Sequence, residues 1–164
     1  MSFSETYLPE FKQEMAGTRK ILERVPEALF TWKPHAKSMA LGRLASHVAE
    51  MPLWAEHTIN LDRLAVSPQD KPFNAATGNE LLATFDHNVA IAIPAIAGAT
   101  DEHVAKIWEL VYGGHVIISM PRIAILRNIV MNHMIHHRGQ LSVYLRLQDI
   151  PVPGMYGPSA DEKG

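Results

Sequence analysis

The sequence contains no cysteine among its 164 residues. Disulfide bonds, thiolate metal ligands and a cysteine nucleophile are therefore excluded, and a metal site must use histidine, aspartate, glutamate or water. An excess of positive charge is also missing, because 15 Lys and Arg residues are balanced by 17 Asp and Glu residues. Proteins that bind nucleic acid usually carry a basic surface, so no nucleic-acid partner is expected.

Long hydrophobic runs are missing as well. The longest, Val89 to Ala99, is too short to span a membrane and is interrupted by Pro94 and Gly98. The segment Met1 to Tyr7 lacks the basic and apolar regions of a signal peptide. We therefore expect no membrane partner, and a cytoplasmic location is the default prediction.

The chain has an apolar fraction of 47%, which together with its length predicts one folded domain over residues 1–164. Apolar residues recur with helical spacing in four segments of the sequence. These segments cover approximately residues 4–23, 38–64, 77–96 and 121–148. Four long helices with short connections are typical of an all-α four-helix bundle.

Two further segments do not have a helical pattern. Gly113-Gly114 lies between two runs of β-favouring residues, which predicts a short β-hairpin just before the last helix. Pro151 and Pro153 end the regular structure, and the tail from there to Gly164 is predicted to be extended.

The most informative residues lie in the last helical segment, where His133 and His137 are four positions apart. On a helix they project from adjacent turns of one face, and two neutral imidazoles placed in this way can grip a metal ion. Both fall at the centre of the apolar face. His136 lies near the edge of that face and is the weaker candidate. Arg138 falls on the opposite side of the helix, where a solvated residue is expected.

A third histidine, His47, lies near the rim of the apolar face of the second helix. A single histidine in this position is more often a hydrogen-bonded core residue than a ligand. Glu50 follows one turn later and is interpreted as a solvated carboxylate or one that supports the site without binding the metal. Buried imidazoles need polar partners, which a metal would supply and direct hydrogen bonds could also supply.

These histidines give the chain its resemblance to the DinB-like (DinB/YfiT) family of small metalloproteins. Other matching features lie on both sides of them in the sequence. They are Leu41 to Glu50 around His47, the run Arg138-Gly139-Gln140-Leu141 after His137, Trp32-x-Pro34, and the tail from Pro153 to Ser159. The resemblance covers nearly the whole chain. It implies a four-helix bundle in which His47, His133 and His137 hold one divalent metal ion, usually nickel or zinc.

The resemblance further implies a metal-dependent enzyme, with a thiol S-transferase or a hydrolase that uses a low-molecular-weight thiol as the expected activities. Because the chain has no cysteine, the sulfur would come from that thiol. Met51, Trp54, Gln140 and Tyr144 are expected to line the mouth of the site, while the catalytic residues stay unknown.

Two alternatives to an enzyme stay open at this point. One is a non-catalytic metal-binding module of a stress response, and the other is a helical protein whose packed histidines bind no metal. Long bundle helices often pair, which favours a homodimer.

Overall fold

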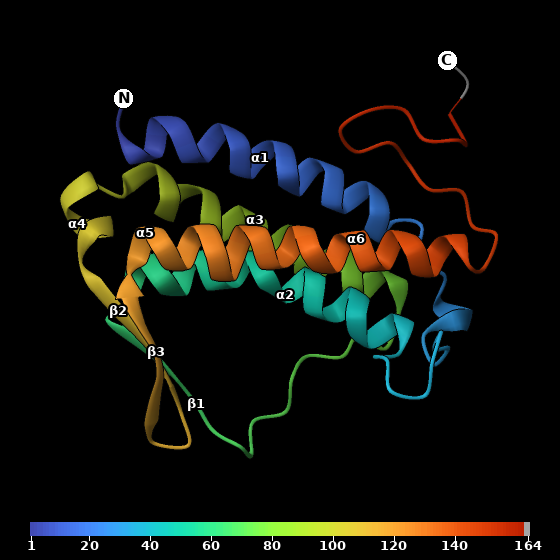
Figure 1. Ribbon diagram of the computed structural model, residues 1–164, viewed down its shortest axis with the longest axis horizontal. Helices are drawn as coiled ribbons and strands as arrows, with labels where there is room; N and C mark the ends of the chain where they lie inside the picture. Colours follow the sequence, from blue (N-terminus) through green and yellow to red (C-terminus); the bar gives the residue numbers. More distant parts are fainter. Residues whose placement is uncertain (163–164) are drawn as a thin grey trace.

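The computed structural model describes residues 1–162, so Lys163 and Gly164, the end of the predicted domain and tail, lie outside the described residues. The structure is mostly helical with one small three-stranded sheet (Figure 1). In chain order the elements are α1 (Phe3–Leu22), the 3₁₀ turn η1 (Glu27–Leu29), α2 (Leu41–Asn60), β1 (Arg63–Val66), α3 (Gly78–Gly98), α4 (Asp101–Ala105), β2 (Ile107–Tyr112), β3 (His115–Pro121), α5 (Arg122–Ile125), the π-helical turn η2 (Leu126–Asn132) and α6 (His133–Arg146).

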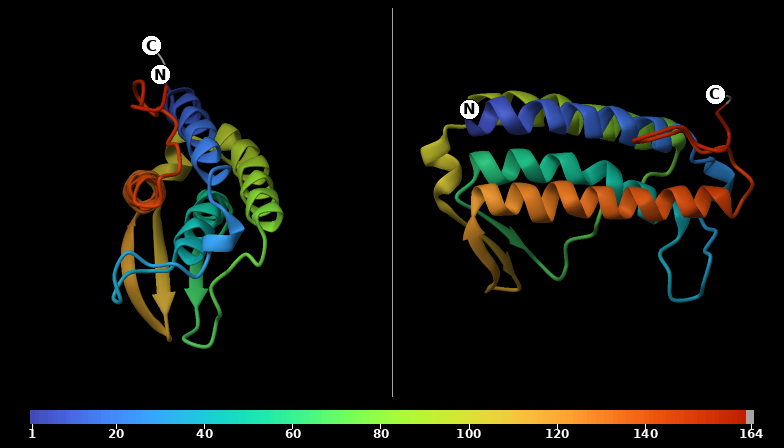
Figure 2. Two further views of the ribbon diagram at one scale, coloured as in Figure 1. Left: turned by 90° about the vertical axis from the view of Figure 1, so that its right-hand side faces the viewer. Right: turned by 45° about the horizontal axis from the view of Figure 1, so that its top comes forward.

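The long helices run side by side. Helix α1 contacts α3 and α6, and α2 contacts the same two neighbours, so each helix buries its apolar face against two others (Figure 2). The sheet extends from one end of this arrangement (Figure 2). By length and composition alone α3 could cross a membrane, but core helices pass the same test. Here α3 buries Leu81, Phe85, Ala92 and Ile96.

Helix α1 begins at Phe3, one residue before the predicted start at about residue 4. The hydroxyl of Ser2 accepts a hydrogen bond from the amide of Glu5, and the Glu5 carboxylate accepts one of 2.7 Å from the amide of Ser2. This reciprocal pair satisfies two amides that the first turn leaves without helical partners. Ser2 rather than Ser4 caps the helix, because Ser2 has the acidic residue three positions later that completes the capping box.

The predicted β-hairpin is confirmed. Strands β2 and β3 pair in antiparallel fashion, and Gly113 and Gly114 form the turn with φ angles of 56° and 85°. Both angles lie in the left-handed region that a two-residue hairpin turn requires and that glycine adopts without steric cost.

Strand β1 was not predicted, and the prediction that the second helix reaches Leu64 is wrong. Helix α2 ends at Asn60, and Arg63–Val66 pairs in parallel with Glu109–Tyr112 of β2. Apolar residues continue past Asn60 with helical spacing, so the local pattern gives no reason to stop there. The strand forms because the outer edge of β2, more than forty residues later, offers unpaired backbone groups.

The tail is also different from its prediction, since its described residues fold back over the helices instead of extending. The hydroxyl of Tyr156 donates to the Glu14 carboxylate on α1, at 2.9 Å, and Asp161 pairs with Arg146 at the end of α6. The partners of these side chains are distant in sequence, so the composition of the tail alone does not reveal them.

Candidate metal centre

Two helices bring three histidines together. His47 lies in the second turn of α2, while His133 and His137 lie in the first two turns of α6. The Nε2 atoms of His47 and His133 are 3.5 Å apart, and those of His133 and His137 are 2.8 Å apart. Each residue offers one ligand nitrogen, and the three nitrogens lie within 4.8 Å of one another. The structure thus brings together the three side chains that the family resemblance joined.

The outward-facing nitrogens determine which lone pairs face the centre. The Nδ1 of His133 lies 3.3 Å from the carbonyl oxygen of Ile129, and the Nδ1 of His137 lies 2.7 Å from the side-chain oxygen of Gln140. Because an oxygen of this kind only accepts, each Nδ1 carries the proton of the neutral ring. Each Nε2 then presents a lone pair to the other across 2.8 Å. Two such lone pairs repel unless a cation lies between them.

The spacing of these nitrogens suits a transition metal. Two imidazole nitrogens bound tetrahedrally at about 2.0–2.1 Å from one ion lie roughly 3.3 Å apart. The Nε2 separations of 2.8 Å and 3.5 Å fall on either side of this value. The three histidines therefore fit a divalent ion with small adjustments of the rings.

Burial keeps two of the rings neutral. Desolvation lowers the pKa of His133, helped by the nearby His47. Desolvation also lowers the pKa of His137, to about 4, against the opposing effect of its hydrogen bond to Gln140. Metal ligation requires the neutral imidazole, so at pH 7 both rings are in the form that binds.

Glu50 supports the third histidine from outside. Its carboxylate oxygen lies 3.8 Å from the Nδ1 of His47 and 3.2 Å from the guanidinium of Arg43, while its other oxygen accepts a 2.9 Å hydrogen bond from the amide of Phe73. Burial alone raises the pKa of Glu50, but these contacts reverse the effect and the net pKa is lowered. A charged carboxylate thus faces His47, which agrees with the supporting role considered for Glu50.

The four residues expected at the mouth of the site have different surroundings. Gln140 contacts His137 directly, as described above. Met51 is only 1% exposed and belongs to the core, and Trp54 is half-buried between the helices and the sheet. Tyr144 is half-buried and packs edge-on against Trp32, with ring centroids 5.7 Å apart. Their role as a substrate pocket stays a prediction.

The backbone before His133 was predicted to be part of one regular helix from residue 121 to residue 148. Instead, Leu126–Asn132 forms a π-helical turn with hydrogen bonds from residue i to i+5, between α5 and α6. Two of its carbonyls also accept side-chain hydrogen bonds, Leu126 from the hydroxyl of Tyr7 and Ile129 from His133. Such turns occur frequently at functional sites. Apolar spacing does not detect this one, because the widened turn keeps Val130 and Met131 buried.

Arg138 corrects another expectation. It was expected to be solvated, yet its side chain is 4% exposed and forms an ion pair of 2.7 Å with Glu14 of α1. Helix α6 contacts both α1 and α2, so the side turned away from the histidines is buried as well. The centre consequently lies on a helix that is fixed on two faces.

The contact between Gln140 and His137 leads to the first testable prediction. Gln140→Leu removes the acceptor that orients the imidazole, and losing such a partner typically weakens metal binding by about 10–100-fold. The measurement is competition for zinc with a chromophoric chelator. Ser142→Ala is the matched control, since its hydroxyl bonds the carbonyl of Gly139 on the same helix. Equal zinc affinity in the Gln140→Leu variant and the wild type would contradict the role of Gln140.

The fold and the site together define a class: a mostly helical protein with a small sheet and three converging histidines that could hold a metal. The chain belongs to the DinB family, which it matches over residues 1–163. The family resemblance noted in the sequence is thereby confirmed.

Individual relatives support the same fold. The chain is 26% identical over 158 residues to the uncharacterized protein YrdA of Bacillus subtilis strain 168. This match covers 95% of this chain and 89% of YrdA. A crystal structure of a DinB-like protein from Bacillus cereus ATCC 10987 matches with a TM-score of 0.70 at 20% identity, covering 93% of this chain and 97% of that chain. The crystal structure of the DinB-like protein YjoA from Bacillus subtilis matches with a TM-score of 0.68 at 17% identity. This match covers 93% of this chain and 98% of YjoA.

Proposed function

We propose that this protein is a metal-dependent enzyme with the four-helix bundle of its family, in which His47, His133 and His137 bind one divalent ion, nickel or zinc. In the proposed reaction a low-molecular-weight thiol displaces a leaving group from an electrophile. The alternative reaction is a hydrolysis in which the thiol takes part. The observation that supports the metal is the convergence of three histidine nitrogens within 4.8 Å of one another, with the Nε2 atoms of His133 and His137 2.8 Å apart. A divalent ion held by three imidazoles supplies a Lewis acid with at least one coordination position left for an exchangeable molecule.

The residues of the chain determine how such a site would be held and reached. Gln140 and the carbonyl of Ile129 fix the protonated nitrogens of His137 and His133, and Glu50 faces the outer nitrogen of His47. His47 and His133 are partly exposed and His137 is buried, so the cluster is reached from the side of His47 and His133. With no cysteine in the chain, a sulfur nucleophile has to come from a second molecule.

The experiment that tests this function uses protein loaded with cobalt(II), whose visible spectrum reports its ligands. We expect 2-mercaptoethanol to change the spectrum at micromolar to millimolar concentration, and the His47→Ala variant to bind less cobalt. The same protein loaded with zinc or nickel should then accelerate the reaction of the thiol with 1-chloro-2,4-dinitrobenzene.

The outcomes separate the alternatives. A cobalt spectrum that no thiol or azide changes would mean that the coordination shell is closed, and the enzyme would be rejected. A thiol-sensitive spectrum without product would favour the non-catalytic metal-binding module. If the protein binds no divalent ion, both the enzyme and the metal-binding module would be rejected.

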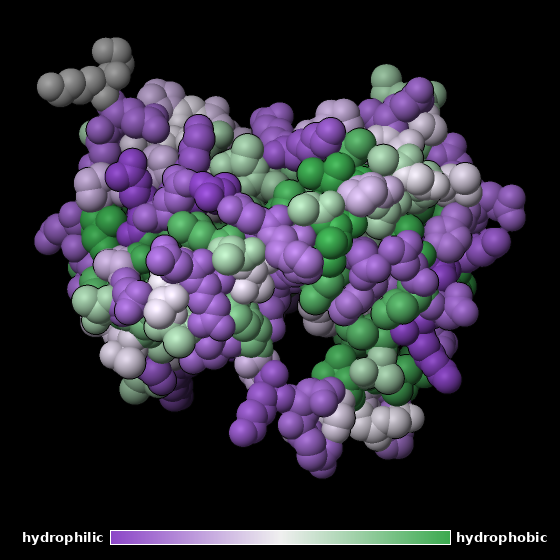
Figure 3. All heavy atoms as spheres, turned by 180° about the vertical axis from the view of Figure 1, so that it is seen from behind, coloured by the Kyte–Doolittle hydropathy of each residue, from purple (hydrophilic) through white to green (hydrophobic). Residues whose placement is uncertain are grey.

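For the partner and the location we propose a homodimer in the cytoplasm. Strand β3 is an edge strand without a charged residue, and Val116 and Ile117 on it are about half exposed. Hydrophobic side chains gather over the part of the surface where the sheet lies (Figure 3). Unprotected edge strands tend to pair with another strand. A monomer mass in sedimentation equilibrium at micromolar concentration would contradict the dimer.

A further inference from the structure

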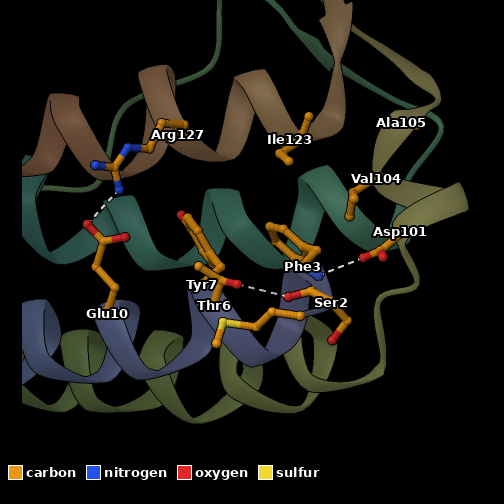
Figure 4. Close-up of a pocket in the computed structure, with 11 residues that line it drawn as sticks. Ser2, Phe3, Thr6, Tyr7, Glu10, Asp101, Val104, Ala105, Ile123 and Arg127 are labelled. Carbon is orange, nitrogen blue, oxygen red and sulfur yellow. Dashed lines mark hydrogen bonds and ion pairs between the residues drawn. The ribbon is translucent and has the colours of Figure 1, made fainter.

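A cleft lies near the start of the chain, well separated from the histidines. It has a volume of about 630 Å³ and lies between α1, α4 and the α5–η2 segment (Figure 4). Phe3 and Tyr7 form one wall, Val104 the second and Ile123 the third. We call it the N-terminal cleft. None of the three histidines lines the cleft, so it is not part of the metal centre.

The walls of the N-terminal cleft are braced from both ends. At one end Arg127 of η2 forms a 2.6 Å ion pair with Glu10 of α1. At the other end the carboxylate of Asp101, in the first turn of α4, accepts a 2.6 Å hydrogen bond from the amide of Phe3. These contacts tie α1 to both neighbouring segments. The cleft is therefore formed in advance, which is usual for small-molecule sites of this size.

The chemistry of the lining limits what it can recognise. Phe3 and Tyr7 stack with ring centroids 5.0 Å apart and are 8% and 6% exposed, so they present a fixed aromatic surface. The polar groups around them already have partners: the hydroxyl of Tyr7 donates to the carbonyl of Leu126 at 2.8 Å, and that of Thr6 donates to the carbonyl of Ser2 at 3.0 Å. An apolar ligand would leave these contacts, and the ion pair of Glu10 with Arg127, intact.

We propose that the N-terminal cleft is a binding site for an uncharged, mainly apolar small molecule, recognised by its aromatic or aliphatic surface. Such a molecule gains affinity by removing the exposed parts of Ile123 and Met1, which both line the cleft, from water. The site works independently of the histidine cluster and does not depend on the proposed enzyme activity.

The test uses N-phenyl-1-naphthylamine, an uncharged fluorophore whose emission rises in apolar surroundings. We expect saturable binding of one molecule per chain. Ile123 is 46% exposed, so Ile123→Lys should leave the fold intact. The new ammonium group should weaken binding by about tenfold or more, because an apolar site disfavours an unpaired charge. Ala105→Trp, a substitution at an exposed lining position, should weaken binding by filling the cleft.

Two control variants outside the N-terminal cleft show where the fluorophore binds. Val143→Lys changes an equally apolar residue, 57% exposed on α6 and outside the cleft, and should leave the affinity within about twofold of wild type. His137→Ala should also leave it unchanged. The proposal is overturned by unsaturable binding, by equal affinity in Ile123→Lys and Val143→Lys, or by loss of binding in His137→Ala, which would move the probe to the histidine cluster.

Discussion

Replacement of His137 by alanine is expected to abolish the stabilisation of this protein by zinc or nickel. An ion that binds only the folded state adds about 2.7 kcal/mol at a concentration one hundred times its Kd. For a chain of this size that corresponds to a rise in Tm of roughly 5–10 °C. The rise requires all three imidazoles, and His137 is the buried one of the three, with its Nε2 2.8 Å from that of His133. Thermal melts with added zinc and with EDTA measure it.

The matched control is His87→Ala. His87 is exposed on α3 and lies outside the three-histidine cluster, so its variant should keep the full response to metal and chelator. If EDTA lowers the Tm of His137→Ala as much as that of the wild type, the metal is held elsewhere and the assignment of the centre is wrong.

Removal of Glu14 is expected to destabilise the fold by about 3–5 kcal/mol, because it leaves a buried guanidinium without its counter-charge. The side chains of Arg138 and Glu14 are 4% and 8% exposed, and Arg138 also donates to the hydroxyl of Tyr156 at 2.6 Å. Glu14→Leu fills the space of the Glu14 side chain with an apolar one, but it removes the carboxylate that accepts from both Arg138 and Tyr156. Urea unfolding measures the loss of free energy.

Two variants test the cause of this effect. Asp86→Ala breaks the exposed ion pair with Arg19 and should cost at most about 1 kcal/mol, since such pairs are screened by water. The double variant Glu14→Leu with Arg138→Met removes both charges and should recover much of the stability. A loss under 1 kcal/mol in Glu14→Leu would show that the buried pair contributes little.

Local spacing was enough to predict part of the centre. His133 and His137 are on one face because a helix repeats every 3.6 residues, and this holds whatever the rest of the chain does. His47 lies 86 residues before His133, and its spacing alone placed it only near a rim. The family resemblance joined it to the pair, and the packing of α2 on α6 brings it within reach.

Three features that the sequence did not predict depend on partners far along the chain. Strand β1 needs the edge of β2, the buried position of Arg138 needs Glu14 on α1, and the folded tail needs the same carboxylate. Short-range periodicity describes one face of one helix at a time. It therefore missed a helix with two buried faces, and it also missed the widened turn of Leu126–Asn132.

That widened turn makes the length of the last helix a critical quantity. If the same seven residues of Leu126–Asn132 closed as a regular α-helix, everything before the turn would rotate by about 100° relative to everything after it, because the wider π-helical turn holds one residue more than an α-helical turn. The hairpin and Ile125, which packs beneath the sheet, lie on one side of the turn, and the metal-centre residues of α6 lie on the other. A deletion of one residue within this stretch should thus be tolerated better than a deletion within the regular helix α6, because closing the widened turn absorbs the missing residue and keeps the phase between the sheet and the histidines.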